Sequence, residues 1–206
     1  IRINLLRITM KDLEKTNIRF FNLIAGYYDF FFGNWIRTTQ KKAINIIKIR
    51  NNSKILDVGC GTGNFLKILE SSKKNLNLYG IDISKEMLKI AKGKLKKSKL
   101  EIKSVEKIDF KDNSFDYVFS IDAFHHYSNQ NLSIKKFNKI LKENGCLAVI
   151  DLSFGLFLNK IFQKIEPGNN KMHSPEEMRH LFKMNKFRDV KQNKVGLFTT
   201  LTYGTK

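Results

Sequence analysis

Proline and cysteine are both scarce in this chain of 206 residues, which holds two of each. So few prolines, together with 42% hydrophobic residues, argue against a disordered chain. Cys60 and Cys146 are too few for a disulfide framework, and they predict free thiols in a reducing cytoplasm. No apolar run reaches the roughly 18 residues that a membrane span needs, because the best candidate, 146–158, is interrupted by Asp151 and Ser153.

Acidic residues are also few. There are 19 Asp and Glu against 38 Lys and Arg, which gives a net charge of +19 and predicts an anionic partner such as RNA or a membrane surface. Yet Lys, Ile and Asn, whose codons are rich in A and T, are all abundant. Only seven Arg are present, although Arg reads phosphates and bases best. Genome composition bias, contact with an anionic membrane or substrate, and RNA binding all stay open.

The length predicts a single domain over 1–206, because 24.0 kDa suits one full-sized core and no repeat or linker is apparent. No secretory signal is evident. The chain begins with Ile1, and Met10 is a candidate for the native start.

The stretch 54–66, with the sequence KILDVGCGTGNFL, organises the chain. Its first residues form a short apolar run that is typical of a buried parallel strand. Gly59, Gly61 and Gly63 follow at every second position, which predicts a sharply turned loop that a ligand approaches closely. From Asn64 onward apolar residues recur at helical spacing, so the loop opens a helix whose N-terminal amides face the ligand. This arrangement predicts a nucleotide-type site.

The spacing of the glycines separates this loop from two common phosphate-binding loops. The third glycine of a G-x-G-x-x-G fingerprint would be Asn64, and no G-x-x-x-x-G-K-[ST] sequence is present. Asp57 lies two residues before the first glycine, where a carboxylate would repel a polyphosphate and attract an ammonium group. The ligand is therefore predicted to carry positive charge.

The sequence DVGCGTG resembles motif I of the class I S-adenosylmethionine (SAM)-dependent methyltransferases. The resemblance implies SAM as the cofactor and S-adenosylhomocysteine (SAH) as the product. It also implies that the cofactor is bound by the loop residues Asp57, Gly59, Cys60, Gly61 and Gly63. Cys60 is not expected to be a nucleophile, since this loop often carries a cysteine in that family.

Asp82 ends the next predicted strand, 75–81. A carboxylate at this place in a β-α-β unit can accept two hydrogen bonds from a ribose diol. The alternative, an Asp that caps the following helix, competes with Ser84, which is itself a good N-cap. The sequence Y-G-I-D-I-S resembles the family here, so Asp82 and Ile83 are predicted to bind the cofactor.

The segment that would bind the adenine of SAM departs from the family pattern. Relatives commonly have Asp-Ala-Glu-x-Leu-Pro-Phe, whereas Ser104 and Val105 stand in the first two places here and Asp109 replaces the proline. The backbone amide of Val105 or Glu106 is therefore predicted to read the adenine ring in place of a side chain.

The pattern F-x-x-x-A-x-x-Y-D is matched by Phe21, Ala25, Tyr28 and Asp29. It resembles the N-terminal signature of ubiquinone/menaquinone-type C-methyltransferases and related small-molecule methyltransferases. In those relatives this segment covers the cofactor and helps build the acceptor pocket, so Tyr28 is predicted to bind the cofactor. The aromatic run 27–35 predicts a lid, an interface or simple packing against the core.

The carboxyl end of the predicted fourth strand is the expected meeting point of methyl donor and acceptor, because ligands bind at strand carboxyl ends in doubly wound sheets. Ser120 is therefore a predicted cofactor contact. His125 and His126 are candidate general bases, needed only if the acceptor is poorly nucleophilic; alternatively, one packs and the other bonds a loop carbonyl. No metal site is predicted, because adjacent side chains rarely converge and no third ligand is indicated. The F-H-H-Y form resembles the broad small-molecule branch of the superfamily more than the quinone methyltransferases.

The predicted fold is α/β and Rossmann-like: a doubly wound, mostly parallel seven-stranded sheet with an antiparallel C-terminal hairpin. A helical lid over about 10–50, made of helices at 11–25 and 35–49, precedes a core over 51–206. Residues 173–177 predict a helix start with a capping box, and 153–170 an insertion that shapes the acceptor pocket. Strands are predicted at 55–58, 75–81, 100–105, 115–120, 146–152, 187–192 and 196–203, with a turn at 144–145.

Together these patterns predict a SAM-dependent methyltransferase with a small-molecule acceptor that can be lipophilic. Two alternatives stay open, an RNA methyltransferase that uses the basic surface and a non-catalytic SAM-binding protein. Intact Asp57, glycines and Asp82 disfavour the second. Neither the acceptor atom nor the oligomeric state is predicted.

Overall fold

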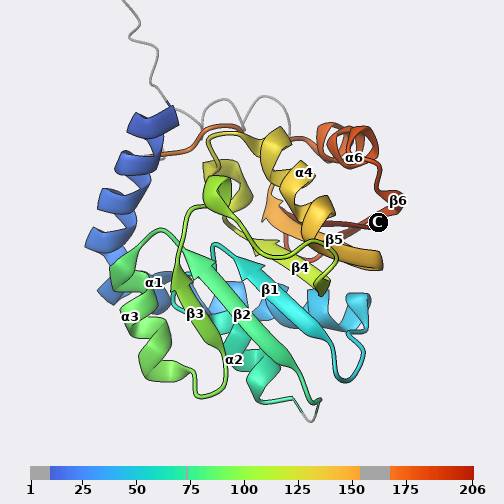
Figure 1. Ribbon diagram of the computed structural model, residues 1–206. Coiled ribbons are helices and arrows are strands. Elements are labelled where there is room, and N and C mark those ends of the chain that lie inside the picture. The colour runs from blue at the N-terminus through green and yellow to red at the C-terminus, as the bar shows by residue number, and fades with distance from the viewer. Residues whose placement is uncertain (1–9, 73, 154–167) are drawn as a thin grey trace, which may run out of the picture.

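A seven-stranded sheet forms the centre of the computed structural model, which describes residues 10–72, 74–153 and 168–206 (Figure 1). Its order is β3-β2-β1-β4-β5-β7-β6, with β1 to β5 parallel and β7 antiparallel to both β5 and β6. The predicted doubly wound sheet with its antiparallel C-terminal hairpin is confirmed. The strands are β1 (Lys54–Val58), β2 (Asn77–Asp82), β3 (Lys99–Ile102), β4 (Phe115–Ile121), β5 (Leu141–Leu152), β6 (Arg188–Lys194) and β7 (Thr199–Thr205).

Helices lie on both sides of the sheet, and two of them start at the predicted caps. Ser84 accepts a hydrogen bond from the amide of Met87 (3.1 Å), and Ser174 forms the predicted capping box with Glu177. The predicted insertion at 153–170 falls mostly outside the described residues. The helices are α1 (Met10–Ile47), α2 (Asn64–Glu70), α3 (Lys85–Lys94), α4 (Gln130–Ile140) and α6 (Pro175–Met184), with short 3₁₀ turns η1 (Val105–Lys107) and η2 (Phe124–His126).

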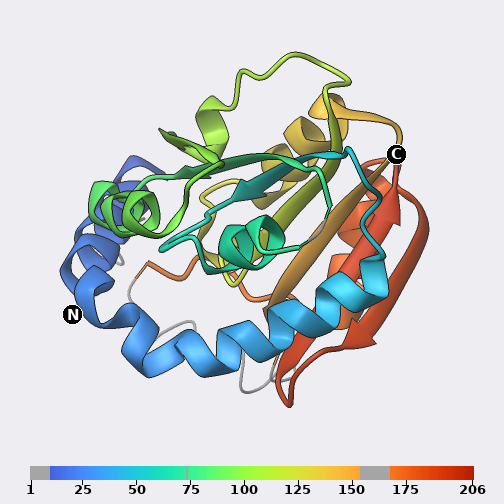
Figure 2. The same ribbon diagram turned by 90° about the horizontal axis from the view of Figure 1, so that it is seen from below.

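Helix α1 corrects the prediction of two separate N-terminal helices, because it runs unbroken for 38 residues. Gly26 and Gly33 lie in its interior, where each costs about 1 kcal/mol relative to alanine. Burial of Ala25, Ile36 and Ala43 against the rest of the protein offsets this cost. Figure 2 shows α1 passing along one side of the whole molecule. Despite its length, neither α1 nor any other helix in the described ranges is apolar enough to cross a membrane.

The turn predicted at 144–145 lies inside β5 and does not precede it. Phe115 pairs with Leu141 and Tyr117 pairs with Cys146, so residues 142–145 stand opposite a single residue of β4. Asn144 adopts a positive φ of 59° in this bulge. The predicted turn is therefore a bulge within β5, which pairs with β4 both before and after it.

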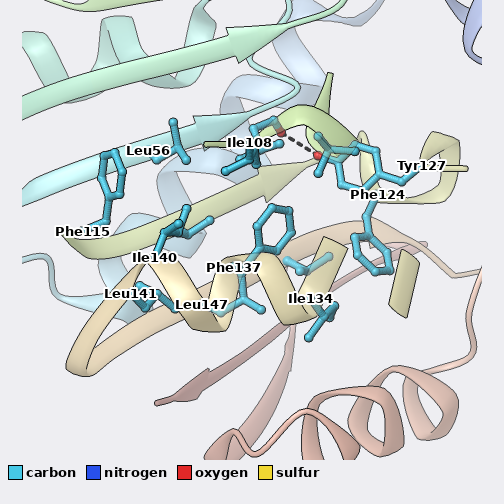
Figure 3. Packing of buried hydrophobic residues seen from close by; sticks show 14 of the residues in the cluster. Leu56, Ile108, Phe115, Phe124, Tyr127, Ile134, Phe137, Ile140, Leu141 and Leu147 are labelled. Atoms are coloured by element: carbon cyan, nitrogen blue, oxygen red, sulfur yellow. Dashed lines mark hydrogen bonds between the residues drawn. The ribbon is translucent and has the colours of Figure 1, made fainter. Parts of the chain in front are cut away.

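Two hydrophobic clusters cover the two faces of the sheet. Alternate residues of β1 enter different clusters, Ile55 one and Leu56 the other, as expected for a parallel strand covered on both faces. Figure 3 shows the cluster that contains Leu56, with Phe137 of α4 packed over the strands. Asp57 lies between Leu56 and Val58 in β1 and is 1% exposed. Burying a carboxyl group at that position costs free energy, which points to a role for Asp57 in a site at the carboxyl end of β1.

Candidate cofactor and acceptor site

A cavity of about 950 Å³, counted with the space that opens to solvent, lies at the carboxyl ends of β1, β2 and β4. Side chains of α1 line it from the opposite side. Of the residues predicted from sequence, nine line this cavity: Tyr28, Gly59, Cys60, Gly61, Asp82, Ile83, Val105, Glu106 and His126. Four predicted residues do not line the cavity: Asp57, Gly63, Ser120 and His125.

The glycine loop after β1 has the left-handed backbone that its spacing predicts. Gly59, Gly61 and Gly63 have φ values of +73°, +52° and +79°. A Cβ atom on Gly59 would lie 2.5 Å from Cβ of Ala123, so a side chain here would collide with the loop after β4. A Cβ atom on Gly63 would lie 2.8 Å from the side chain of Leu95. Gly59 therefore shapes the cavity, whereas Gly63 permits close packing behind it.

Asp82 lies at the end of β2 and is held by two backbone amides. Its Oδ2 accepts from the amide of Gly61 (2.8 Å) and its Oδ1 from that of Ser84 (2.8 Å). Burial raises the pKa of Asp82, and these hydrogen bonds oppose the increase. The carboxylate thus links the glycine loop to the start of α3, at the wall of the cavity.

Asp57 is buried behind the glycine loop. Its Oδ1 has no hydrogen-bond partner among the residues that the structure describes. Burial, and to a smaller extent the charge of Asp82, raise the pKa of Asp57 to about 8. A cationic ligand in the cavity would favour its ionised form, so this pair of carboxyl groups suits a nucleoside with a positively charged tail.

Glu106 shapes the part of the cavity that was predicted to hold adenine. Its carboxylate accepts hydrogen bonds from the hydroxyls of Ser104 and Ser128. Burial raises the pKa of Glu106, but these bonds outweigh it, so the net shift is downward. The amide of Glu106 donates to Ser104 Oγ (3.3 Å). Of the two amides that were predicted to contact the adenine ring, the amide of Val105 is therefore the one that does not bind this hydroxyl.

Asp29, the last residue of the N-terminal signature, fixes α1 to the glycine loop. Its Oδ1 accepts from Thr62 Oγ1 (2.6 Å) and Asn64 Nδ2 (2.8 Å), and its Oδ2 forms an ion pair with Lys94. Burial raises the pKa of Asp29, but the bond from Lys94 and those from Thr62 and Asn64 lower it overall. The adjacent Tyr28 lines the cavity beside this anchor.

Two further polar contacts hold α1 over the cavity. Asn17 Nδ2 donates to the carbonyl of His126 (3.1 Å), and Asn22 Oδ1 accepts from Ser84 Oγ (2.7 Å). With Asp29, these residues fasten one helix to the loops after β1, β2 and β4. The helix therefore closes the cavity on the side away from the sheet.

The two adjacent histidines have different surroundings. His126 lines the cavity, packs edge-on against Phe21 at 4.9 Å between ring centres, and has its Nδ1 3.1 Å from the carbonyl of Gly168. His125 is 2% exposed, and Asp151 of β5 accepts hydrogen bonds from both its Nδ1 and its amide. His125 thus supports the loop, while His126 faces the ligand space.

Ser120 is fully buried beneath the cavity floor. Its Oγ lies 2.8 Å from the hydroxyl of Tyr127, which donates to the carbonyl of Val58 (2.9 Å). Tyr127 itself lines the cavity. Ser120 therefore positions a cavity wall and does not form one.

The sequence predicted that the segment after the fourth strand forms the floor of the site, and residues 121–123 and 126–128 do line the cavity, but part of the lining from α1 was not predicted. The cavity residues of α1 recur near helical spacing, but this pattern was not recognised because the first helix was assumed to end near Gly26. The lining residues of α1 that were not predicted are Glu14, Asn17, Ile36 and Gln40.

Comparison with known proteins identifies relatives of the core. Residues 56–149 match the family model described as "Methyltransferase domain". An uncharacterised protein of Methanocaldococcus jannaschii is 34% identical over 134 residues, which cover 64% of this chain and 50% of that protein. A demethylmenaquinone methyltransferase of Thermotoga maritima is 29% identical over 147 residues, covering 68% of this chain and 62% of that enzyme. The chain thus spans between half and two thirds of the length of these curated relatives.

A solved structure shares nearly the whole fold. It comes from a complex between the Haloferax volcanii Trm112 methyltransferase activator and a putative methyltransferase, and the match has a TM-score of 0.81 and 19% identity. The match covers 90% of this chain and 96% of that one. At this identity the likeness concerns the fold alone.

Proposed function

We propose that this chain, which belongs to the superfamily of class I SAM-dependent methyltransferases, is an enzyme that transfers a methyl group from SAM to a small-molecule acceptor. One observation carries the proposal: Asp82, Gly59 and Gly61 line the same cavity, and Asp57 is buried directly behind the glycine loop. The relationship to a demethylmenaquinone methyltransferase supports a small acceptor, which can be lipophilic.

The residues have distinct proposed roles toward the cofactor. Asp82 and Ile83 hold the ribose, the Val105 amide reads the adenine ring, and the loop 59–61 packs against the amino-acid tail. Bound SAM supplies the activated methyl group. Helix α1, held by Asp29, contributes Tyr28 to the site and keeps water from it. Positioning and water exclusion of this kind can supply about 7 to 11 kcal/mol of the barrier reduction.

The test is thermal unfolding with SAH, compared with NAD at the same concentration. At a hundred times its dissociation constant, a ligand of the folded state adds about 2.7 kcal/mol of stability, which corresponds to several degrees. We expect the shift with SAH alone, followed by turnover when methyl-labelled SAM is supplied with small acceptors. A larger shift with NAD would contradict the cofactor assignment. Turnover on RNA alone would contradict the acceptor class, and SAH binding without any turnover would leave a binding protein.

His126 is the imidazole that we propose as general base. A carbonyl can only accept, so the bond to Gly168 puts the proton on Nδ1 and makes Nε2 the nitrogen that takes up a proton. His125 lies behind His126, with 4.1 Å between the ring centres, and its proposed role is only to hold the loop in position.

Replacing His126 by glutamine is expected to lower kcat by roughly a hundredfold or more on an acceptor that must lose a proton. SAH affinity should stay nearly unchanged, because the cofactor contacts are elsewhere. Steady-state kinetics and calorimetry on the same samples separate these effects. His180→Gln, on the exposed part of α6, is the matched control. An unchanged kcat in His126→Gln would remove this residue from the mechanism.

A further inference from the structure

The outer face of α1 carries a continuous apolar stripe. Leu23, Tyr27, Phe30 and Phe31 are 80%, 69%, 84% and 69% exposed. Their spacing of four, three and one places them on one side of the helix, opposite the side whose residues line the cavity. Single exposed apolar residues are common, but a contiguous group of this size marks an interaction surface.

The same face is positively charged. Arg19 precedes the stripe, and Arg37, Lys41 and Lys42 follow it, all of them exposed and at helical positions that share the outer side. Asp29 is the one acidic residue of α1 between positions 15 and 47, and it turns inward to pair with Lys94. The face thus combines an apolar centre with basic ends, and its charge complements an anionic surface.

We propose that this face docks α1 onto an anionic lipid membrane. Leu23, Tyr27, Phe30 and Phe31 enter the boundary between headgroups and acyl chains, while the flanking basic residues contact lipid headgroups. The net charge of +19 acts in the same direction. Exposed Leu23 within the stripe favours a lipid surface over RNA, because a leucine side chain has no ring on which a base can stack. The opposite side of the same helix lines the cavity, so docking would bring the site to within about one helix diameter, ~10 Å, of the lipid phase.

Trp35 provides a direct reporter, since it is the chain's single tryptophan, lies one turn after Phe31 and is 39% exposed. The full chain is titrated with vesicles of phosphatidylcholine alone or mixed with phosphatidylglycerol. We expect a blue shift of the tryptophan emission and co-sedimentation with the mixed vesicles. Both should weaken at high salt and be small with phosphatidylcholine alone. Failure to bind the anionic vesicles would overturn the proposal.

The double variant Phe30→Ser/Phe31→Ser tests the stripe itself. It should weaken vesicle binding at least roughly tenfold, because two apolar side chains no longer enter the lipid. Matched controls are Ile102→Ser on β3 and Met184→Ser on α6, which remove exposed apolar side chains elsewhere and should leave vesicle binding unchanged. Equal losses in the controls would overturn the assignment to α1.

Two other occupants are separated by the same variants. A dimer in light scattering that the Phe30→Ser/Phe31→Ser change dissociates would make this face a contact between copies, and RNA binding lost in that variant would make it an RNA surface. Either result without vesicle binding overturns the proposal. SAH binding by the double variant should equal that of the wild type, so failure of membrane docking and failure of the methyltransferase function are distinguishable.

Discussion

Replacing Asp82 by alanine is expected to weaken SAH binding by roughly a hundredfold or more. Two charge-assisted hydrogen bonds to a ribose diol would be lost, each contributing about 1.5 to 3 kcal/mol. The carboxylate also holds the amides of Gly61 and Ser84 at 2.8 Å, so the variant loosens the loop and the start of α3 together. Calorimetry with SAH measures the loss directly.

Ribose recognition and loop support can be separated by a second ligand. A 2′-deoxy analogue of SAH should bind the wild type more weakly than SAH does, while Asp82→Ala should no longer distinguish the two ligands. Asp112→Ala, which removes one carboxylate from the surface, is the charge control and should bind SAH normally. If the variant lost affinity but still discriminated against the deoxy analogue, Asp82 would support the loop without touching the ribose.

The glycine loop and the strand before it were predictable because their signals are local. Three glycines at alternate positions need a backbone that other residues rarely adopt, and the structure gives all three a positive φ. Similarly, the start of α6 was readable from Ser174 and Glu177, which satisfy each other within one turn. Such features depend on neighbouring residues alone.

Features that depend on distant residues were not predictable. Gly26 reads locally as a helix end, yet α1 continues because Asn17, Asn22 and Asp29 bond to loops that lie far away in the sequence. Likewise, nothing in the pair His125 and His126 says which one faces the cavity. The η2 turn decides this, together with Asp151 from β5. Local patterns therefore predicted much of the lining of the candidate site, but the helix that closes the cavity could be recognised only from the tertiary contacts.

Buried Asp57 is expected to make the stability of the unliganded protein fall as pH rises. The folded chain keeps a proton on this carboxyl up to about pH 8, whereas the unfolded chain releases it near the ordinary pKa of 3.8. Between these values unfolding releases a proton, so each pH unit lowers the free energy of unfolding by about 1.4 kcal/mol. The full effect is on the order of 6 kcal/mol, and it levels off above pH 8, where both states are ionised.

The variant Asp57→Asn isolates this contribution, because an amide of the same shape does not titrate. Urea unfolding of both proteins from pH 4 to 8 should show the wild type losing stability relative to the variant as pH rises. Asp112→Asn, on the surface, should follow the wild type. Parallel curves for wild type and Asp57→Asn would mean that the buried carboxyl is ionised throughout.

The same proton connects stability to ligand binding. If a cationic ligand prefers ionised Asp57, binding must lower its pKa, and by linkage the affinity must rise with pH up to about 8. SAM affinity of the wild type should therefore increase over this range, while that of Asp57→Asn should stay nearly flat. A buried carboxyl that costs stability in the empty protein would then be retained because it favours a positively charged ligand.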